Sequence, residues 1–290
     1  MNMHLEDLVD SMRVDMDLMV VKKEPTRSTR GDQFQATLIV ADRTGSVMVK
    51  RFGTRDECGR FLDKIDLRRI YRFGGRYDKR YNTIALDGEP RLADNPDRGD
   101  FERDIGVPPE IPARLGEYTK KIKNGYIASL LDSLFSDDML KKRFLTYPAA
   151  TKHHHARDNG LAEHVLEMLG VAETICCIYP KMSRDLLFCG CILHDIGKTA
   201  ELDVSPAPHY TSDGNYISHI PLGCQMVLEH ISKLGAGFPD DLKRDILHMI
   251  LSHHGKPTPD KPSFMEPRTP EAKALHCIDM LSAQISPAFD

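Results

Sequence analysis

The stretch Ile192-Leu193-His194-Asp195-Ile196-Gly197-Lys198 decides how the second half of this 290-residue chain folds. It closes an apolar run that predicts a buried helix, and Gly197 would let the chain turn sharply after the two polar residues. An imidazole and a carboxylate side by side at a helix end can both reach one metal ion, or the carboxylate can bridge two. The pair is a weak signal alone, so its meaning depends on its surroundings.

Side chains of the same chemistry lie around this stretch in order. His164 stands upstream in an apolar helical segment, and Asp279 stands downstream in another, where a carboxylate is costly unless it is paired or metal-bound. His219 and two adjacent histidines border further predicted helices and could hold a second ion, with Asp195 as the bridge. The predicted metal ligands are His164, His194, Asp195, His219, His253, His254 and Asp279.

This imidazole-rich set predicts a divalent transition metal, as one ion or two. Mn²⁺ is our first choice, with Fe²⁺, Co²⁺, Ni²⁺ or Zn²⁺ as alternatives, because Mg²⁺ and Ca²⁺ prefer oxygen ligands. Two ions about 3.5–4 Å apart can clamp the attacking and leaving oxygens of phosphoryl transfer. Lys198 could contact a substrate phosphate and offset developing charge, or it could be a solvated lysine at a helix end. Asp195 and Lys198 are the predicted catalytic residues.

The front of the chain, residues 1–95, is predicted to be β-rich. Phe34–Ala41 and Val47–Phe52 flank turn-forming residues and predict a hairpin, and a second hairpin is predicted over residues 70–86. A short helix is predicted at Arg55–Ile65. Strands at this spacing with one helix favour a small β-barrel with the OB-fold as leading candidate, although propensity alone supports only a small β domain.

Residues 96–112 are rich in Pro and Gly and predict a linker, because these residues interrupt regular structure. Residues 113–290 show apolar spacings near the helical period and predict an all-α bundle. The predicted helices are Leu115–Leu134, Asp137–Thr146, Leu161–Tyr179, Asp185–His194, Pro221–Leu234, Leu242–Leu251 and Pro270–Gln284. The predicted fold class is therefore α+β and multidomain, with a small N-terminal β-barrel followed by a helical bundle.

Charge gives a mixed indication about nucleic acid. The net charge of −4 gives no overall basic character, yet residues 50–80 hold eleven Lys or Arg against five Asp or Glu. This excess predicts a basic face, or only a solvated surface with scattered arginines. The residues that predict contacts with a single strand in an OB-fold groove are Arg51, Phe52, Arg72, Phe73, Arg76, Tyr77 and Tyr81. Neighbours on a strand point to opposite faces, so Phe73 or Tyr77 can equally lie in the core.

The cysteines and the N-terminus indicate the compartment. Seven cysteines occur without a Cys-x-x-Cys pair, which argues against a zinc ribbon and favours reduced, buried thiols. The first residues lack the basic and apolar regions of a signal peptide, and no apolar run approaches the roughly 18 residues of a transmembrane helix. We predict a cytoplasmic protein that does not enter a membrane, and the oligomeric state stays open.

The order His164, His194-Asp195 and Asp279 resembles the HD-domain metal-dependent phosphohydrolase superfamily. More closely, the sequence is similar to the YhaM-type 3′-5′ exoribonucleases, which join an N-terminal OB-fold to an HD domain. The resemblance is carried by His154-His155-Ala156, Gly160–His164, Ile192–Lys198, Ser218–Gly223, Leu251–Gly255, Glu271-Ala272 and Leu275–Asp279. It departs from the family pattern at Asn159, where a glycine is expected, and around Asp279, where Ile278 and Met280-Leu281 replace the expected Asn-Leu-Asp context.

The resemblance implies hydrolysis of phosphodiester bonds from the 3′ end of single-stranded RNA or DNA, with release of nucleoside monophosphates. It implies that the OB-fold holds the strand, that the seven residues above bind two metals, and that His154, His155 and Lys198 contact the substrate.

Two other functions stay open. One is an HD-domain phosphohydrolase of small nucleotides, a phosphomonoesterase or triphosphohydrolase, with a regulatory OB domain. A cyclic-dinucleotide phosphodiesterase is disfavoured, because Lys256-Pro257-Thr258-Pro259 follows the paired histidines instead of the expected motif. The other is a non-catalytic protein that binds single-stranded nucleic acid, against which the intact ligand set argues.

Overall fold

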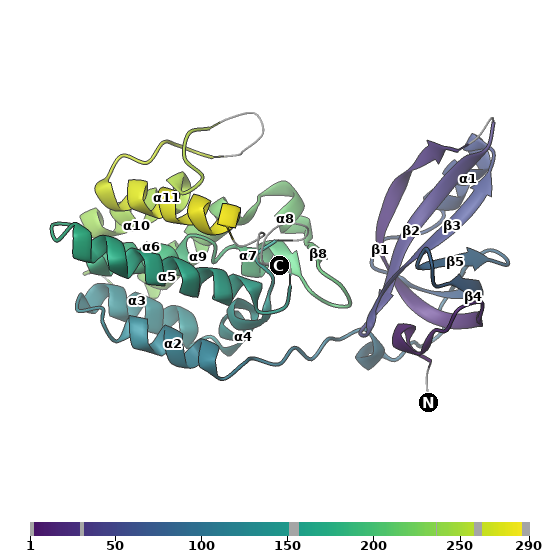
Figure 1. The fold of residues 1–290 in the computed structure, drawn as a ribbon, viewed down its shortest axis with the longest axis horizontal. Coiled ribbons are helices and arrows are strands. Elements are labelled where there is room, and N and C mark those ends of the chain that lie inside the picture. The colour runs from purple at the N-terminus through teal and green to yellow at the C-terminus, as the bar shows by residue number, and fades with distance from the viewer. Residues whose placement is uncertain (1–2, 30–31, 151–156, 236, 258–262, 286–290) are drawn as a thin grey trace. The chain divides into compact units, whose positions relative to one another are not determined.

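The computed structural model describes residues 3–29, 32–150, 157–235, 237–257 and 263–285 (Figure 1). The chain divides into two compact units. One comprises Met1–Asp104 with Val204–His209, and the other comprises Ile105–Asp203 with Tyr210–Asp290. None of the helices described has both the length and the apolar character that crossing a membrane requires.

The first unit is a closed β-barrel. Its strands are β1 (Arg13–Ser28), β2 (Phe34–Asp42), β3 (Gly45–Gly53), β4 (Ile70–Asp78) and β5 (Thr83–Leu86). They pair in the order β1-β2-β3-β5-β4, and β1 closes the barrel by pairing with β4 as well. The β3–β5 pair is parallel and the other pairs are antiparallel. The predicted OB-like barrel is thereby confirmed.

Strand alternation builds the barrel interior. On β1, Val14, Met16, Leu18 and Val20 are buried at every second position, because successive side chains of a strand point to opposite faces. Helix α1 (Arg55–Asp63) lies between β3 and β4 in sequence and begins with a Thr54–Glu57 capping box. Its Cys58 and Phe61 complete this core. The remaining short elements are β6 (Arg91–Leu92) and 3-10 turns at Leu5–Asp7 and Arg98–Asp100.

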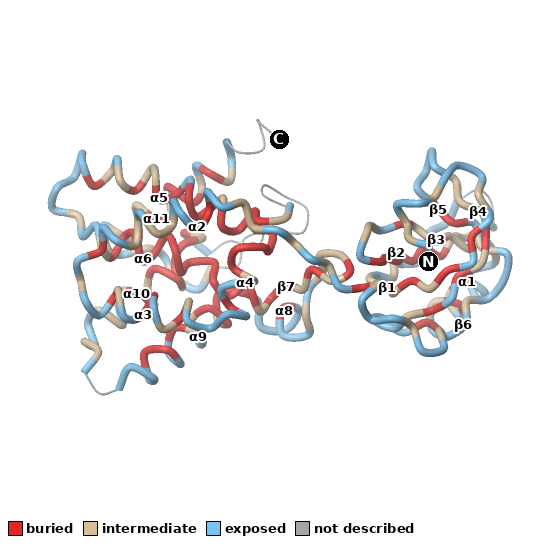
Figure 2. The backbone as a smooth tube through the Cα atoms, turned by 90° about the horizontal axis from the view of Figure 1, so that it is seen from below, coloured by how far each residue is buried: buried red, intermediate tan, exposed pale blue. Residues whose placement is uncertain are grey.

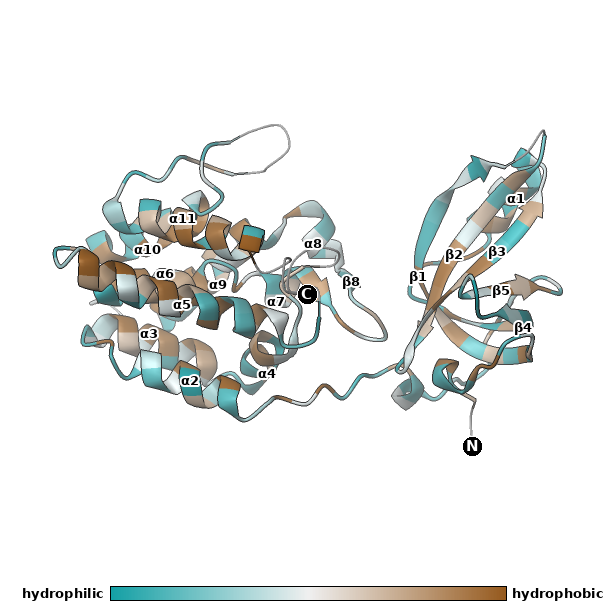
Figure 3. Ribbon diagram, viewed as in Figure 1, coloured by the Kyte–Doolittle hydropathy of each residue, from teal (hydrophilic) through white to brown (hydrophobic). Residues whose placement is uncertain are grey.

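The second unit is helical, as predicted. Its elements are α2 (Glu110–Thr119), α3 (Gly125–Phe135), α4 (Asp138–Thr146), α5 (Gly160–Ile178), α6 (Arg184–Leu193), α7 (Lys198–Glu201), α8 (Ser212–Tyr216), α9 (His219–Lys233), α10 (Asp240–Ser252), α11 (Pro270–Ile285) and the short strands β7 (Leu202–Asp203) and β8 (His209–Tyr210). Buried residues concentrate on α5 and α6 (Figure 2), and apolar side chains are dense along α5 (Figure 3). Leu161, Leu169, Phe188 and Ile192 are among the core residues of these two helices.

The single helix predicted at Leu115–Leu134 is wrong, because the chain forms α2 and α3 there. Asn124 begins α3 by accepting hydrogen bonds from the backbone N–H groups of Tyr126 and Ile127. Asp185 accepts the N–H groups of Lys123 and Asn124 at 2.9 and 2.7 Å, which fixes the break from another helix. Side-chain acceptors of this kind compete with continued helix.

Candidate metal centre

The ends of several helices bring the predicted ligands together in the second unit. His164 lies on α5 and Asp279 on α11, whereas His219 is the first residue of α9. His194 ends α6, with Asp195 directly after it, and the two adjacent histidines follow the last residue of α10. Six of the seven side chains are buried, and His254 is half-buried. All seven predicted ligands are thus part of one cluster.

The cluster consists of two groups that share Asp195. Ligand atoms of His164, His194 and Asp279 lie within 4.8 Å of one another, and so do those of His219, His253 and His254. Asp195 Oδ2 lies 3.3 Å from His194 Nε2 in the first group. Its Oδ1 lies 3.5 Å from His219 Nε2 and 3.7 Å from His253 Nε2 in the second. One carboxylate therefore faces both groups.

Four buried atoms at the centre of the cluster have no hydrogen-bond partner. They are His194 Nε2, Asp195 Oδ1, His219 Nε2 and His253 Nε2, and no other buried side-chain nitrogen or oxygen is unpaired in the described part of the chain. Unpaired buried polar atoms are costly, and here the Nε2 atoms of three imidazoles surround one carboxylate group, two of them near Oδ1 and one near Oδ2. These donors fit a divalent transition metal, which accepts imidazole and carboxylate ligands.

The other ring nitrogens explain why Nε2 faces the centre. His194 Nδ1 lies 3.0 Å from the Cys191 carbonyl oxygen, and His253 Nδ1 lies 2.7 Å from that of Ile250. A carbonyl oxygen only accepts hydrogen bonds, so these Nδ1 atoms carry the proton and each Nε2 keeps a free lone pair. His164 Nδ1 is 2.9 Å from the hydroxyl of Ser282.

In the metal-free cluster the electrostatics favour the metal-binding protonation states of Asp195 and His253, whereas at His194 the Asp195 and Asp279 carboxylates outweigh burial and raise the pKa. Burial alone would raise the pKa of Asp195, but the Lys198 ammonium and the His194 imidazole outweigh burial and hold this pKa well below its usual value. Burial, with the neighbouring His254 and His194 rings, lowers the pKa of His253 well below its usual value. Ionised carboxylates and neutral imidazoles are the forms that coordinate metals.

Lys198 is an ion-paired residue and not a solvated one. Its Nζ lies 2.6 Å from Asp195 Oδ2, and its side chain is 14% exposed. Burial would lower the pKa of Lys198, but the Asp195 carboxylate outweighs burial and raises it. The alternative of a solvated helix-end lysine does not hold, and a positive charge lies beside the ligand cluster.

From the sequence we expect Gly197 to permit a sharp turn, and this reason is wrong. Its φ of −63° and ψ of −18° are open to any residue, so no special turn depends on it. A Cβ at this position would overlap the carbonyl oxygen of His219 and lie 2.6 Å from the nitrogen of Gly223. Gly197 is therefore required for close contact between the chain after Asp195 and the first turn of α9.

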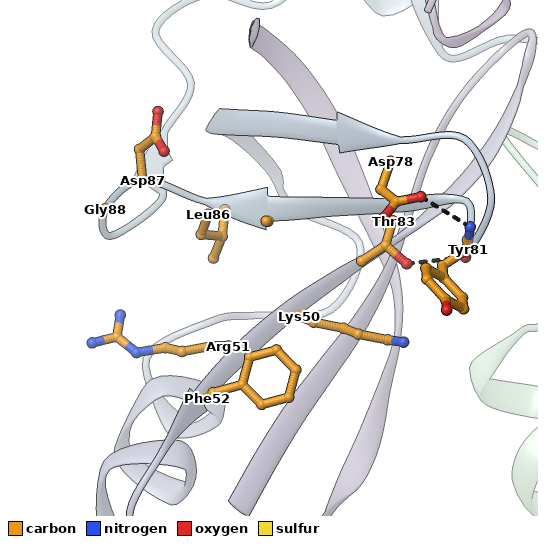
Figure 4. A pocket seen from close by; sticks show the side chains of 10 residues that line it. Lys50, Arg51, Phe52, Asp78, Tyr81, Thr83, Leu86, Asp87 and Gly88 are labelled. Atoms are coloured by element: carbon orange, nitrogen blue, oxygen red, sulfur yellow. Dashed lines mark hydrogen bonds between the residues drawn. The ribbon is translucent and has the colours of Figure 1, made fainter. Parts of the chain in front are cut away.

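A surface depression of about 690 Å³ on the barrel gathers some of the predicted nucleic-acid contacts (Figure 4). Arg51, Phe52 and Tyr81 line it, and Phe52 and Tyr81 are 53% and 55% exposed. Lys50, which the sequence analysis did not single out, also lines it. Lys50 and Phe52 are two positions apart on β3 and share one face of the strand, whereas Val49, directly before Lys50, is buried.

The predicted contacts on β4 are not among the residues that line this depression. Phe73 is fully buried and packs edge-to-face on Tyr71, so its assignment as a stacking residue is corrected. Tyr77 is half-buried against the core and donates a hydrogen bond to Asn82 at 3.0 Å. Arg72 pairs with two β1 carboxylates, at 2.9 and 3.3 Å, and Arg76 is exposed on the same strand. Predicted substrate contacts His154 and His155 lie outside the described residues.

Comparison with known proteins gives consistent similarities. Residues 161–284 match the family model described as HD domain. The 3′-5′ exoribonuclease YhaM of Bacillus licheniformis is 33% identical over 282 residues, which cover 94% of this chain and 86% of that protein. YhaM of Oceanobacillus iheyensis is 32% identical over 284 residues, which cover 94% and 85%, and YhaM of Bacillus subtilis is 32% identical over 282 residues, which cover 94% and 86%.

Proposed function

This chain belongs to the family of 3′-5′ exoribonucleases represented by YhaM, and from that premise we propose that it is itself a metal-dependent 3′-5′ exoribonuclease. Its substrate is single-stranded RNA, with single-stranded DNA as a further candidate, and its products are nucleoside monophosphates. The observation that carries the proposal is the set of four unpaired buried atoms around Asp195. Imidazole and carboxylate ligands of this kind hold the metal in many hydrolytic transition-metal sites.

The two ligand groups suggest which residues would hold which metal. His164, His194 and Asp279 form the first proposed group and the three other histidines the second, with Asp195 common to both. A bound divalent metal supplies Lewis acidity to a phosphate oxygen and lowers the pKa of water. The imidazole content favours Mn²⁺ first, then Fe²⁺, Co²⁺, Ni²⁺ or Zn²⁺.

Lys198 is proposed to act on the scissile phosphate. Its ammonium group is held at 2.6 Å from Asp195, so a positive charge is already in place beside the ligand groups. A fixed cation stabilises negative charge that develops on phosphate oxygens in the transition state, without reorganising during the reaction. Asp195 holds this cation in place while it faces both ligand groups.

The barrel depression is proposed to bind the single strand. The exposed rings of Phe52 and Tyr81 offer surfaces on which bases stack, and Lys50 and Arg51 supply positive charge. Such stacking is tolerant of sequence because every base has a π face. This arrangement supports a strand-binding role for the barrel that is separate from hydrolysis.

We expect Phe52→Ala and Tyr81→Ala each to weaken binding of a single-stranded RNA oligonucleotide by about 1–3 kcal/mol, the range for one stacked base. Fluorescence anisotropy at one fixed salt concentration measures the change, because affinity for nucleic acid depends on salt. Leu92→Ala is the matched control, since Leu92 is 52% exposed on β6 and is not among the residues lining the depression. Equal affinities for all three variants and the unaltered protein would exclude this face.

The proposed activity is tested with a time course on 5′-labelled single-stranded RNA and DNA in the presence of Mn²⁺. We expect a ladder of labelled products that shortens from the 3′ end, and the two rates rank RNA against DNA. His194→Ala, with its fold checked by circular dichroism, is expected to leave the RNA intact. A different result would identify a small-nucleotide phosphohydrolase instead. In that case the oligonucleotide stays uncut with Mn²⁺, Co²⁺, Ni²⁺ and Fe²⁺, and a mononucleotide is hydrolysed.

A further inference from the structure

Glu201 is a buried carboxylate beside the ligand cluster that the proposed chemistry does not use. It ends α7, is 7% exposed, and is the only buried glutamate within the described ranges of the chain. Burying a carboxylate is costly unless hydrogen bonds compensate it. The groups that Glu201 contacts therefore indicate its purpose.

Both contacts of the Glu201 carboxylate are made to His219. Its Oε1 accepts the backbone N–H of His219 at 2.9 Å and lies 3.1 Å from the ring Nδ1. An ionised carboxylate only accepts hydrogen bonds, so Nδ1 carries the ring proton. Nε2 is then left with a free lone pair, 3.5 Å from Asp195 Oδ1 and without a hydrogen-bond partner. The carboxylate thus determines which nitrogen of His219 can bind a metal.

The surrounding backbone holds each side of this contact in place. Thr211 donates its N–H to the Glu201 carbonyl at 2.9 Å, and a Cβ on Gly214 would overlap that same carbonyl oxygen. Helix α8 therefore packs directly on the Glu201 backbone. Ser218, just before His219, has φ 68° and ψ 165°, a strained conformation for any residue but glycine. Strain of this kind persists only where neighbouring contacts fix the backbone.

We propose that Glu201 is a positioning residue that fixes His219 as the Nδ1-protonated tautomer and thereby sets the metal affinity of the group His219, His253 and His254. This inference rests on the proposed metal-dependent function. His194 and His253 are oriented by backbone carbonyls of their own helices, which side-chain substitution does not remove. His219 depends instead on a side chain from another helix, and partners of this kind commonly change metal affinity when they are replaced.

The test is a calorimetric Mn²⁺ titration of metal-stripped protein. Glu201→Met keeps a side chain of similar length but removes both acceptor oxygens, and we expect it to weaken Mn²⁺ binding by about 10–100-fold. The same substitution in a His219→Ala background is expected to cause no further loss, because the two residues act as one unit. An equal loss with and without His219 would show that Glu201 acts through another route and would overturn the proposal.

A helix-capping acid provides the matched control for a merely structural role. Glu201 accepts the first N–H of α9, and Asp137 likewise accepts N–H groups of Met139 and Leu140 at the start of α4. Asp137→Ala is expected to lower the melting temperature and leave Mn²⁺ affinity unchanged. Loss of thermal stability without loss of Mn²⁺ affinity in Glu201→Met would reduce Glu201 to a helix cap and refute the inference.

A second measurement needs no Glu201 variant. Nitrogen-15 NMR of the imidazole rings in the unaltered metal-free protein, with His219→Ala used to assign the signal, reports the tautomer directly. A proton on Nδ1 supports the inference, and a proton on Nε2 contradicts it. If the unaltered protein binds no Mn²⁺, the proposed function fails as well. If it binds Mn²⁺ and Glu201→Met binds equally well, only the role of Glu201 fails.

Discussion

Asp195→Asn is expected to lower the rate of RNA hydrolysis by at least about 1000-fold, at or beyond the upper end of what loss of one transition-state stabilising group causes. The carboxylate faces His194 on one side and His219 and His253 on the other. An amide is a neutral and much poorer metal ligand, and its NH₂ group would point hydrogens at lone pairs. Single-turnover rates with saturating Mn²⁺ measure the effect on the chemical step.

Asp195→Asn also leaves the Lys198 ammonium without its 2.6 Å partner. Removing one partner of a buried ion pair costs about 3–5 kcal/mol of stability, so the melting temperature must be measured beside the rate. Asp241→Asn is the matched control, because Asp241 is exposed and pairs with Arg244 at the surface. A folded Asp195→Asn protein that hydrolyses RNA at the unaltered rate would remove Asp195 from the centre of the mechanism.

Chelation of divalent metals is expected to stop hydrolysis completely and to lower the melting temperature. The four unpaired buried atoms lose the cation that compensates them. A ligand that binds only the folded state at 100 times its Kd adds about 2.7 kcal/mol to the free energy of unfolding. Differential scanning calorimetry with EDTA, and then with excess Mn²⁺, measures the difference, while the RNA assay follows recovery of activity.

His194→Ala shows whether Mn²⁺ stabilises the protein by binding at the ligand cluster or by binding elsewhere. This variant lacks a ligand of the first group, so its melting temperature should respond much less to Mn²⁺. Two results together would contradict a metal-dependent mechanism. The unaltered protein would melt at the same temperature with EDTA and with excess Mn²⁺, and it would still hydrolyse RNA in EDTA.

The ligand cluster could be predicted because its members stand in unfavourable contexts. His164 and Asp279 interrupt apolar helical segments, where such side chains are costly without a partner, and the sequence alone reveals that conflict. Glu201 gives no such signal. It ends the four-residue helix α7, and α8, which begins eleven residues later, packs on its backbone. Burial that arises from tertiary contact is not visible in local sequence.

The barrel shows which part of a strand pattern is informative. The spacing of the strands predicted the barrel. The alternation along β4 places Tyr71 and Phe73 on one face of the strand and Arg72 on the other. The rule that neighbours face opposite ways left the place of Phe73 and Tyr77 open between the core and the binding face, and the structure buries Phe73. Applied to β3, the same rule groups Lys50 with Phe52 and would have found Lys50.

The break between α2 and α3 could not be predicted in the same way. Apolar spacing continues through it, and the acceptor that holds the turn, Asp185, is 61 residues beyond Asn124. The apolar spacing therefore predicts one helix, whereas the turn-forming pair Asn124-Gly125 and the distant Asp185 together divide it into two.

The position of Asp195 between two ligand groups makes their occupancies interdependent. Oδ2 faces one group and Oδ1 faces the other, so a cation at either group alters the charge and orientation that the other encounters. By thermodynamic reciprocity, whatever one ion does to the affinity for the second, the second does equally to the affinity for the first. For a protein that binds metal at both groups, one coupling free energy, added to the two separate affinities, would then describe how each occupancy depends on the other.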